Sequence, residues 1–252
     1  MPQAHRLANE AASEDLLVAD SFRVRINTQT GAAEVRGLGH HLARFARSTH
    51  AASGGALRGV GNFLDETSGP ITAYGEGFPR WELWRTAQNG FDLRLSLRPL
   101  PKLGDTISLV SARVPSQPHA DRKGPNISSY AALNSELGAE ALFVGSDGIV
   151  REGATTSLVW WRGEQLLCAA AKDRIASVTE ALLGELFGAL EPAAVTPAEL
   201  AECEVWAVNA LHGIRVVASI DGVDMRAPDS ARLARARAAL DQTWQPFLAA
   251  ER

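Results

Sequence analysis

Paired cysteines, long apolar runs and a surplus of basic charge are all missing from this chain of 252 residues. Its two cysteines, Cys168 and Cys203, lack CxxC spacing, so we expect buried, unreactive thiols rather than a disulfide framework. A net charge of −4 leaves no basic surplus for binding nucleic acid or an anionic membrane surface. No apolar run approaches the length of a bilayer span, and residues 1–14 lack the basic-then-apolar order of a signal peptide. We therefore expect a cytoplasmic protein with no nucleic-acid or membrane partner.

Motifs of several common enzyme classes are also missing. The chain holds no GxGxxG or Walker loop, which argues against binding of a dinucleotide or a nucleoside triphosphate. It holds no GxSxG motif, so serine hydrolase chemistry has no support. Its six histidines show no HExxH or CxxH spacing, and we expect no metal site.

The composition is that of an ordinary globular protein, with 46% apolar and 21% charged residues. Residues 115–122 contain two prolines and many polar residues, which is typical of a linker. We therefore predict a leader at 1–14, a first domain at 15–114, this linker, and a second domain at 123–252. The predicted helices and strands do not alternate as regular βαβ units, which favours the α+β class.

The spacing of apolar residues predicts most of the elements. Recurrence at three and four residues predicts helices over 39–52, 128–137, 179–190 and 231–248. Alternation predicts strands over 22–26, 33–36, 78–85, 91–97, 107–114, 141–145, 157–161, 165–169, 205–208 and 214–220.

Lys123 is followed by Gly124 and Pro125, which keep the backbone tight just after it. A lone lysine is usually a solvated surface residue. The alternative is an amine that attacks an aldehyde, and such an amine must be neutral. Burial or a neighbouring cation would then have to lower its pKa.

Two further segments allow a structural and a functional interpretation. Glu152, in a GIVREGA segment, is either a turn carboxylate or the partner of a pyridine nitrogen, where an anion keeps the ring protonated. Ser177, Val178 and Thr179 precede a predicted helix, so Ser177 is a candidate N-cap. The same free N–H groups at a helix start also bind phosphate.

Two arginines are candidate anion ligands. Arg44 lies on the first predicted helix, where it is either solvated or bound to a phosphate with bidentate geometry. Arg80 has apolar neighbours in its strand and therefore needs a buried anion. That anion is either an internal carboxylate, such as Glu76 or Glu82, or the carboxylate of a substrate.

Taken in order along residues 20–222, these segments resemble the class-IV aminotransferases, the fold-type-IV pyridoxal phosphate (PLP) enzymes. This group includes branched-chain and D-amino acid aminotransferases and 4-amino-4-deoxychorismate lyases. HLAR, ending at Arg44, resembles the family's His-x-x-Arg, and the segment ending in Glu152-Gly153 resembles its G-x-x-x-E-G. Lys123 matches the Schiff-base lysine. SVT at 177–179 resembles Gly-Ile-Thr, and NAL at 209–211 resembles the second phosphate-binding turn.

The resemblance implies an N-terminal α/β sandwich and a C-terminal pseudo-barrel, with pyridoxal 5'-phosphate between them. Lys123 would form the Schiff base and move the catalytic proton. Glu152 would face the pyridine nitrogen. The phosphate would be held by Arg44, Val178, Thr179 and Ala210, and Leu211 would contact the substrate. Arg80, singled out above for its apolar neighbours, is the further candidate for the substrate carboxylate.

The resemblance further implies a homodimer and a PLP-dependent aminotransferase that acts on a small α-amino acid. A pyruvate-releasing 4-amino-4-deoxychorismate lyase is the alternative, because it shares every cofactor contact. A PLP-binding protein with little catalysis, such as a cofactor carrier, is a third possibility.

Overall fold

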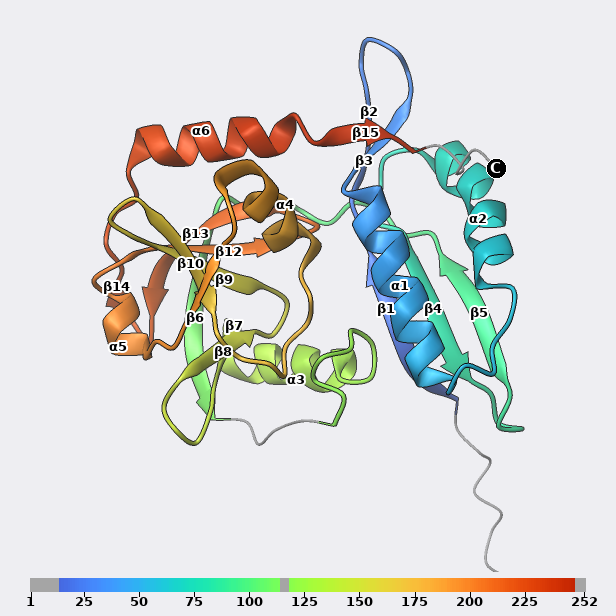
Figure 1. Cartoon of the computed structure of the whole chain (residues 1–252), viewed down its shortest axis with the longest axis horizontal. Coiled ribbons are helices and arrows are strands. Elements are labelled where there is room, and N and C mark those ends of the chain that lie inside the picture. The colour runs from blue at the N-terminus through green and yellow to red at the C-terminus, as the bar shows by residue number, and fades with distance from the viewer. Residues whose placement is uncertain (1–13, 114–117, 248–252) are drawn as a thin grey trace, which may run out of the picture.

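The computed structural model describes residues 14–113 and 118–247 (Figure 1). The predicted leader, apart from Glu14, and residues 114–117 around the start of the predicted linker lie outside this part. The helices are α1 (Leu38–Ala52), α2 (Val60–Tyr74), α3 (Ile127–Leu137), α4 (Val178–Phe187), α5 (Pro197–Leu200) and α6 (Ser230–Asp241). The strands are β1 (Asp15–Ser21), β2 (Val24–Ile26), β3 (Ala33–Arg36), β4 (Arg80–Arg85), β5 (Phe91–Ser96), β6 (Thr106–Arg113), β7 (Glu140–Val144), β8 (Val150–Gly153), β9 (Ser157–Arg162), β10 (Gln165–Ala169), β11 (Glu191–Ala193), β12 (Glu204–Asn209), β13 (Gly213–Ile220), β14 (Val223–Asp224) and β15 (Trp244–Pro246).

One half of the molecule is a small antiparallel sheet in the order β1-β4-β5, covered by α1 and α2 (Figure 1). Its core joins Phe22, Phe45 from α1, Ile71 from α2, and Trp81 and Leu83 from β4. All five side chains are at most 1% exposed. The apolar face of α1 therefore fixes the position of this helix on the sheet, and thereby the positions of its polar side chains.

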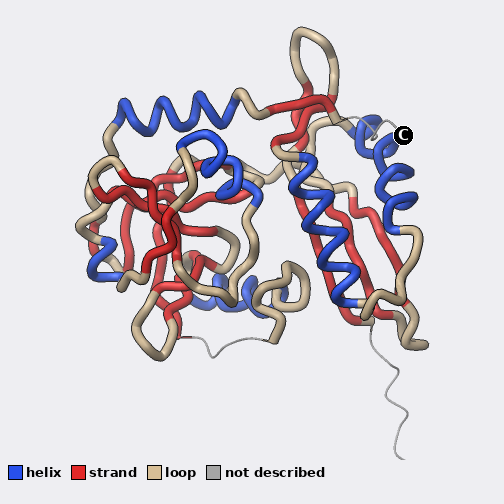
Figure 2. The backbone as a smooth tube through the Cα atoms, viewed as in Figure 1, coloured by secondary structure: helices blue, strands red, loops and turns tan. Residues whose placement is uncertain are grey.

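The other half is a nine-stranded sheet in the order β11-β10-β9-β12-β13-β6-β7-β8, with β14 beside β13 (Figure 2). The pairs β10–β11, β13–β6 and β6–β7 are parallel, and the other pairs are antiparallel. The sheet curls until its two ends meet, because the Val150 N–H of β8 donates to the carbonyl of Val195, just after β11, at 2.8 Å. The predicted α+β fold with a C-terminal pseudo-barrel is confirmed.

Both faces of this curled sheet are buried. Along β9, Leu158 and Trp160 point into the barrel core, whereas Val159 points outward against α4 and α6. The helix α3 covers β7 through Tyr130 and Phe143, whose rings lie 4.6 Å apart. The near-continuous apolar strands of this half follow from that double burial.

A third sheet, in the order β15-β3-β2, joins the two ends of the described chain. The helix predicted over 231–248 is wrong over residues 242–247, since α6 ends at Asp241 and β15 follows, and residue 248 lies outside the described residues. Pro246 cannot donate in a helix interior, and the guanidinium groups of Arg25 and Arg36 instead lie over the Trp244 ring, 4.5 and 4.4 Å from its centre. The C-terminal strand therefore pairs with the first half of the molecule.

Strand pairing also differs from the predicted domain division. The strand β6 falls in the predicted first domain, yet it pairs with β13 and β7 of the large sheet. The strand predicted over 22–26 begins two residues later, as β2 at Val24, and β1 before it was not predicted. Within the described residues, no helix is both long and apolar enough to cross a membrane.

Candidate active site

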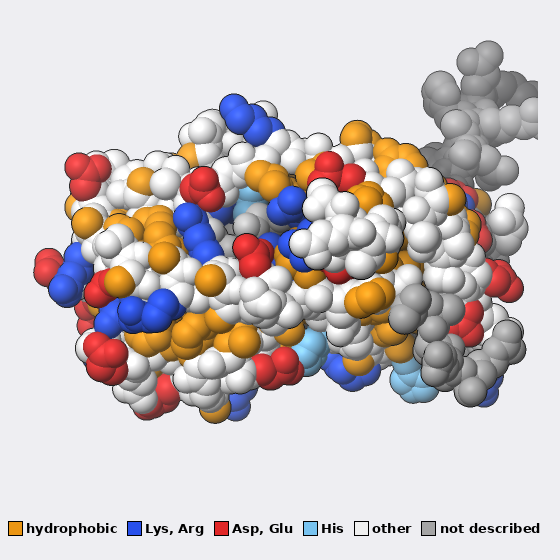
Figure 3. Space-filling model, turned by 90° about the horizontal axis from the view of Figure 1, so that it is seen from above, with side chains coloured by type: hydrophobic (Ala, Val, Ile, Leu, Met, Phe, Trp, Pro, Cys, Tyr) orange, Lys and Arg blue, Asp and Glu red, His pale blue; other side chains and the backbone are white. Residues whose placement is uncertain are grey.

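A cavity of about 370 Å³ lies between the two halves, with walls from both. Its basic lining residues are Arg44, Arg80, Arg98, Arg122, Lys123 and Arg215. Among the described residues of its wall, Glu152 is the single carboxylate. On the face drawn in Figure 3, Lys and Arg side chains also gather near a hollow in the middle of the molecule. Such a wall suits a small ligand that carries more than one negative charge.

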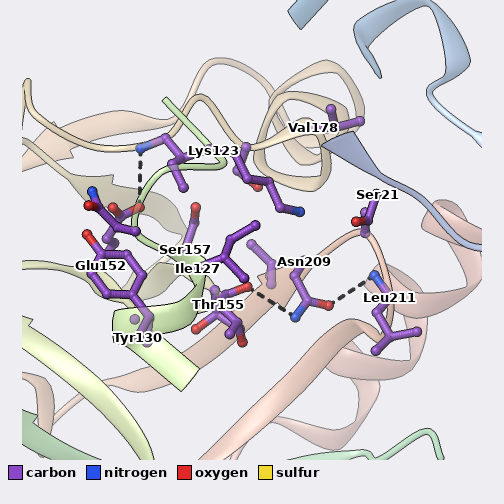
Figure 4. Close-up of a pocket in the computed structure, with 18 of the residues that line it drawn as sticks. Ser21, Lys123, Ile127, Tyr130, Glu152, Thr155, Ser157, Val178, Asn209 and Leu211 are labelled. Atoms are coloured by element: carbon purple, nitrogen blue, oxygen red, sulfur yellow. Dashed lines mark hydrogen bonds between the residues drawn. The ribbon is translucent and has the colours of Figure 1, made fainter. Parts of the chain in front are cut away.

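Lys123 projects into the cavity from the loop before α3 (Figure 4). The Ala19 N–H of β1 donates to the Lys123 carbonyl at 2.7 Å. Gly124 has φ +144°, and a Cβ there would lie 2.7 Å from the Cα of Val18, so only glycine allows this close approach. Burial, aided by the charge of Arg44, lowers the pKa of Lys123 to about 8. A sizeable fraction of the amine is then neutral near physiological pH, as attack on an aldehyde requires.

Glu152 lies on β8 at the other end of the cavity, next to Tyr130 (Figure 4). It is 5% exposed, and its Oε2 accepts one hydrogen bond, from the Ile175 N–H at 3.2 Å. Burial raises the pKa of Glu152 to about 8. A cationic partner would restore the charged carboxylate, so this position suits a protonated ring nitrogen.

The start of α4 supplies an anion site. Ser177 is the N-cap, and its Oγ accepts from the Glu180 N–H at 3.3 Å. In the described part of the chain, the N–H groups of Val178 and Thr179 have no hydrogen-bond acceptor. Both residues are buried, and Val178 lines the cavity. These N–H groups are the ones that a helix start offers to a phosphate.

Arg44 comes close to this helix start from α1. Its Nη1 donates to the Ala176 carbonyl at 2.9 Å. Its Nε and Nη2 bind Asp20, whose other partner is His41 Nδ1 at 2.7 Å. Although burial opposes it, the charges of Arg44 and His41 hold the pKa of Asp20 well below its usual value. Within the described residues, Arg44 Nη1 makes a single hydrogen bond, so its second N–H remains for a ligand.

The turn between β12 and β13 forms the wall opposite Glu152 (Figure 4). Asn209 Oδ1 accepts from the N–H groups of Leu211 at 3.1 Å and His212 at 2.8 Å. The Leu211 N–H is therefore occupied within the turn. Among the described residues, the Ala210 N–H has no acceptor. Ala210 can offer its N–H to an anion, whereas Leu211 offers only its side chain.

Of the two partners considered for Arg80, an internal carboxylate and a substrate carboxylate, the structure contains the internal one. Its guanidinium pairs with Glu82 on the same strand. Glu82 also accepts from Trp84 Nε1 at 2.8 Å and Ser96 Oγ at 3.0 Å. Arg80 still lines the cavity, but its charge is compensated.

Arg98 is a basic residue of the wall that sequence reasoning missed. Its Nη2 donates to Ser21 Oγ at 2.9 Å and its Nε to the Phe78 carbonyl at 3.1 Å. In the described part of the chain no carboxylate pairs with it. Its place directly after the predicted strand 91–97 was the available signal, because a charge that follows an apolar strand often lies at the sheet edge. Asp20 was also missed, because it lies in β1, a strand that the sequence pattern did not predict.

The fold and this cavity together define a PLP-dependent enzyme of fold type IV. Residues 18–220 match the family described as amino-transferase class IV, so the chain belongs to that family. A search of curated proteins found no match.

Solved structures with the same fold share little sequence with this chain. A putative 4-amino-4-deoxychorismate lyase from Legionella pneumophila has a TM-score of 0.75 and 16% identity, over 90% of both chains. A hypothetical aminotransferase from Mycobacterium tuberculosis, with α-ketoglutarate and PMP bound, has a TM-score of 0.74 and 18% identity, over 96% of this chain and 93% of that one. The branched-chain amino acid aminotransferase of Escherichia coli has a TM-score of 0.73 and 16% identity, over 92% of this chain and 86% of that one.

The donor set fits pyridoxal 5'-phosphate, the cofactor of this enzyme. When bound, PLP supplies an electron-withdrawing ring for reactions at the α-carbon of an amino acid. The buried Glu152 is suited to the ring nitrogen, and Lys123 is suited to the aldehyde. The N–H groups of Val178, Thr179 and Ala210, which have no acceptor among the described residues, are suited together with Arg44 to the phosphate.

Proposed function

We propose that this protein is an aminotransferase that uses PLP to move the amino group of a small α-amino acid. The observation that carries the proposal is Arg98, which lines the cavity without a carboxylate partner among the described residues. Its charge also helps to lower the pKa of Lys123. A guanidinium in this position is suited to the carboxylate of an amino acid.

The candidate site residues then have the following roles. Arg44 and the N–H groups at Val178, Thr179 and Ala210 hold the phosphate. Glu152 keeps the ring nitrogen protonated. Lys123 Nζ takes the proton from the α-carbon of the substrate and delivers it to the acceptor carbon. The neutral amine that this requires is supported by the lowered pKa of Lys123.

Arg98 orients the substrate through its carboxylate, and the side chain of Leu211 contacts the substrate. Arg80 lines the wall with its charge paired to Glu82, so we assign it a structural role rather than a contact with the substrate carboxylate. We further propose that the enzyme is a cytoplasmic homodimer, as the family resemblance implies.

A pyruvate-releasing 4-amino-4-deoxychorismate lyase is the second candidate. Two observations favour it. Arg98 and Arg122 both line the cavity without an ion-pair partner in the described part of the chain, which suits a substrate with two carboxylates. The Legionella structure with the TM-score of 0.75 is itself a putative lyase of this kind.

Two assays on one preparation separate the candidates. Amino transfer to 2-oxoglutarate supports the aminotransferase, and pyruvate release from aminodeoxychorismate supports the lyase. Lys123→Ala is the control and should lack both activities. A wild-type protein that retains PLP but shows neither reaction would support the third possibility, a cofactor-binding protein with little catalysis.

A further inference from the structure

A buried carboxylate lies directly behind the cavity wall without touching the cavity. Glu140, the first residue of β7, is 9% exposed. Its two oxygens accept four hydrogen bonds, from Thr155 N at 2.9 Å, Thr155 Oγ1 at 2.8 Å, Thr156 Oγ1 at 2.7 Å and Arg215 Nη2 at 3.2 Å. Glu140 therefore ties together β7, the turn between β8 and β9, and β13.

This network continues into the turn between β12 and β13. The Thr155 carbonyl accepts from Asn209 Nδ2 at 3.3 Å. Asn209 Oδ1 in turn accepts from the N–H groups of Leu211 and His212, and Figure 4 shows the link between Thr155 and Asn209 and the link between Asn209 and Leu211. One continuous chain of hydrogen bonds thus runs from Glu140, through Thr155 and Asn209, to the turn that carries Ala210.

The amide of Asn209 decides which N–H groups of this turn face the cavity. It occupies those of Leu211 and His212, and leaves that of Ala210 for a ligand. His212 is held from its other side as well, since its Nδ1 accepts from the Gly104 N–H at 3.2 Å. A turn fixed at both ends keeps its free N–H in one direction, which binding of an anion with defined geometry requires.

Arg215 completes the network electrostatically. It is 9% exposed and lines the cavity, and it brings the positive charge that allows Glu140 to be buried. Replacement of Glu140 by glutamine would leave Arg215 without its counter-charge and would turn one of the two acceptor oxygens into a donor. The chain of contacts to Asn209 would then lose its fixed end.

We propose that Glu140 and Asn209 are positioning residues that set the β12–β13 turn for binding of the cofactor phosphate and the substrate. The identity of the ligand in this inference rests on the proposed function, whereas the hydrogen-bond network does not depend on it. Neither residue reacts with the substrate. Glu140 acts through Thr155 and Asn209, and Asn209 acts through the backbone of the turn.

Hydrogen exchange tests the network without any activity measurement. In Glu140→Gln, the amide protons of Leu211 and His212 should exchange about tenfold faster, as expected when a buried hydrogen-bond network loses one acceptor. Glu204→Gln is the matched control, because Glu204 is also a buried carboxylate of the large sheet and pairs with Arg232 at 3.0 Å. Unchanged exchange in Glu140→Gln, or equal acceleration in Glu204→Gln, would overturn the proposal.

Ligand binding tests the consequence at the site. Glu140→Gln and Asn209→Ser should each weaken PLP binding and raise the KM of the substrate by about tenfold, with a smaller change in kcat. Because the two residues act in one chain, the double variant should lose less than the product of the two single effects. Multiplicative losses would show independent contributions and contradict the relay.

Failure of the proposed function can be distinguished from failure of the proposed network. A wild-type protein that retains no PLP would refute the proposed function, and the exchange of Leu211 and His212 would still decide on the network. If Glu140→Gln does not fold, Asn209→Ser provides the same exchange test from the cavity surface.

Discussion

Arg44 and Asp20 form a bidentate ion pair, with Nε–Oδ2 at 2.7 Å and Nη2–Oδ1 at 2.8 Å, although 24 residues separate them in the chain. Asp20 lies at the end of β1 and is 1% exposed, and Arg44 lies on α1 beside the start of α4. The carboxylate fixes the direction of the guanidinium before any phosphate arrives. The ligand therefore does not have to order this side chain on binding.

Replacement of Arg44 should weaken PLP binding more than it slows the saturated enzyme. Loss of a charge-assisted partner of an anion costs about 2–5 kcal/mol, which is a large loss of affinity. The N–H groups at the start of α4 should retain part of the phosphate binding. Titration of Arg44→Ala with PLP measures the effect, and Arg47→Ala, an exposed arginine of the same helix, is the control. An unchanged dissociation constant would contradict the assignment.

Attachment of PLP to the protein should depend on pH through Lys123. The pKa of this amine is lowered to about 8, so the neutral, reactive form increases as the pH rises through 8 and is scarce below about 7. The rate of covalent attachment to cofactor-free protein should rise over that range and then level off. Trapping with borohydride and peptide mapping should label Lys123, and Lys123→Ala should take up no label. Label on Lys172 would show that the assignment is wrong.

Replacement of Glu152 by glutamine should preserve PLP attachment but lower turnover by several orders of magnitude. The neutral amide cannot keep the ring nitrogen protonated, and the ring then withdraws electrons less effectively. Single-turnover kinetics on PLP-loaded Glu152→Gln provides the measurement. Glu136→Gln, an exposed glutamate of α3, is the matched control. A near-native rate would show that Glu152 has only a structural role in β8.

Arg80 and Arg98 should respond to alanine substitution in opposite ways. Arg80→Ala strands the buried Glu82 and should cost about 3–5 kcal/mol of stability, with a KM close to native. No carboxylate among the described residues pairs with Arg98, so Arg98→Ala should raise the KM steeply and change the melting temperature less. Arg94→Ala, an arginine of β5 that pairs with Asp92 and Glu14, is the control. A destabilised Arg98→Ala with native KM would remove Arg98 from the site.

Local pattern was sufficient for the fold class and for many element positions. The strand at 33–36, the helix at α3 and the hairpin β9–β10 are within about a residue of their predicted bounds. The family motifs also identified PLP as the cofactor. Lys123, Arg44, Glu152 and Val178 all line one cavity. Their individual roles stay predictions until the variants above are measured.

The elements that sequence reasoning missed depend on contacts across the fold. The helix α2 contains Gly61, Gly69 and Pro70, all poor helix formers, and is supported by burial of Ile71 and by the hydrogen bond from Trp81 to Thr67. The strand β15 exists because β3 offers it an edge. The pairing of Asp20 with Arg44 joins two separate segments in the same way. These contacts join segments far apart in the chain, so a short stretch of sequence cannot predict them.

The pairing of β15 with β3 has a consequence for biosynthesis. Residues 33–36 emerge early from the ribosome, but their partner at 244–246 is made more than two hundred residues later. Until then, β3 has only β2 beside it and exposes an open edge, the kind of edge that other nascent chains can pair with. The sheet of β2, β3 and β15 is therefore complete only after residues 244–246 have been synthesised.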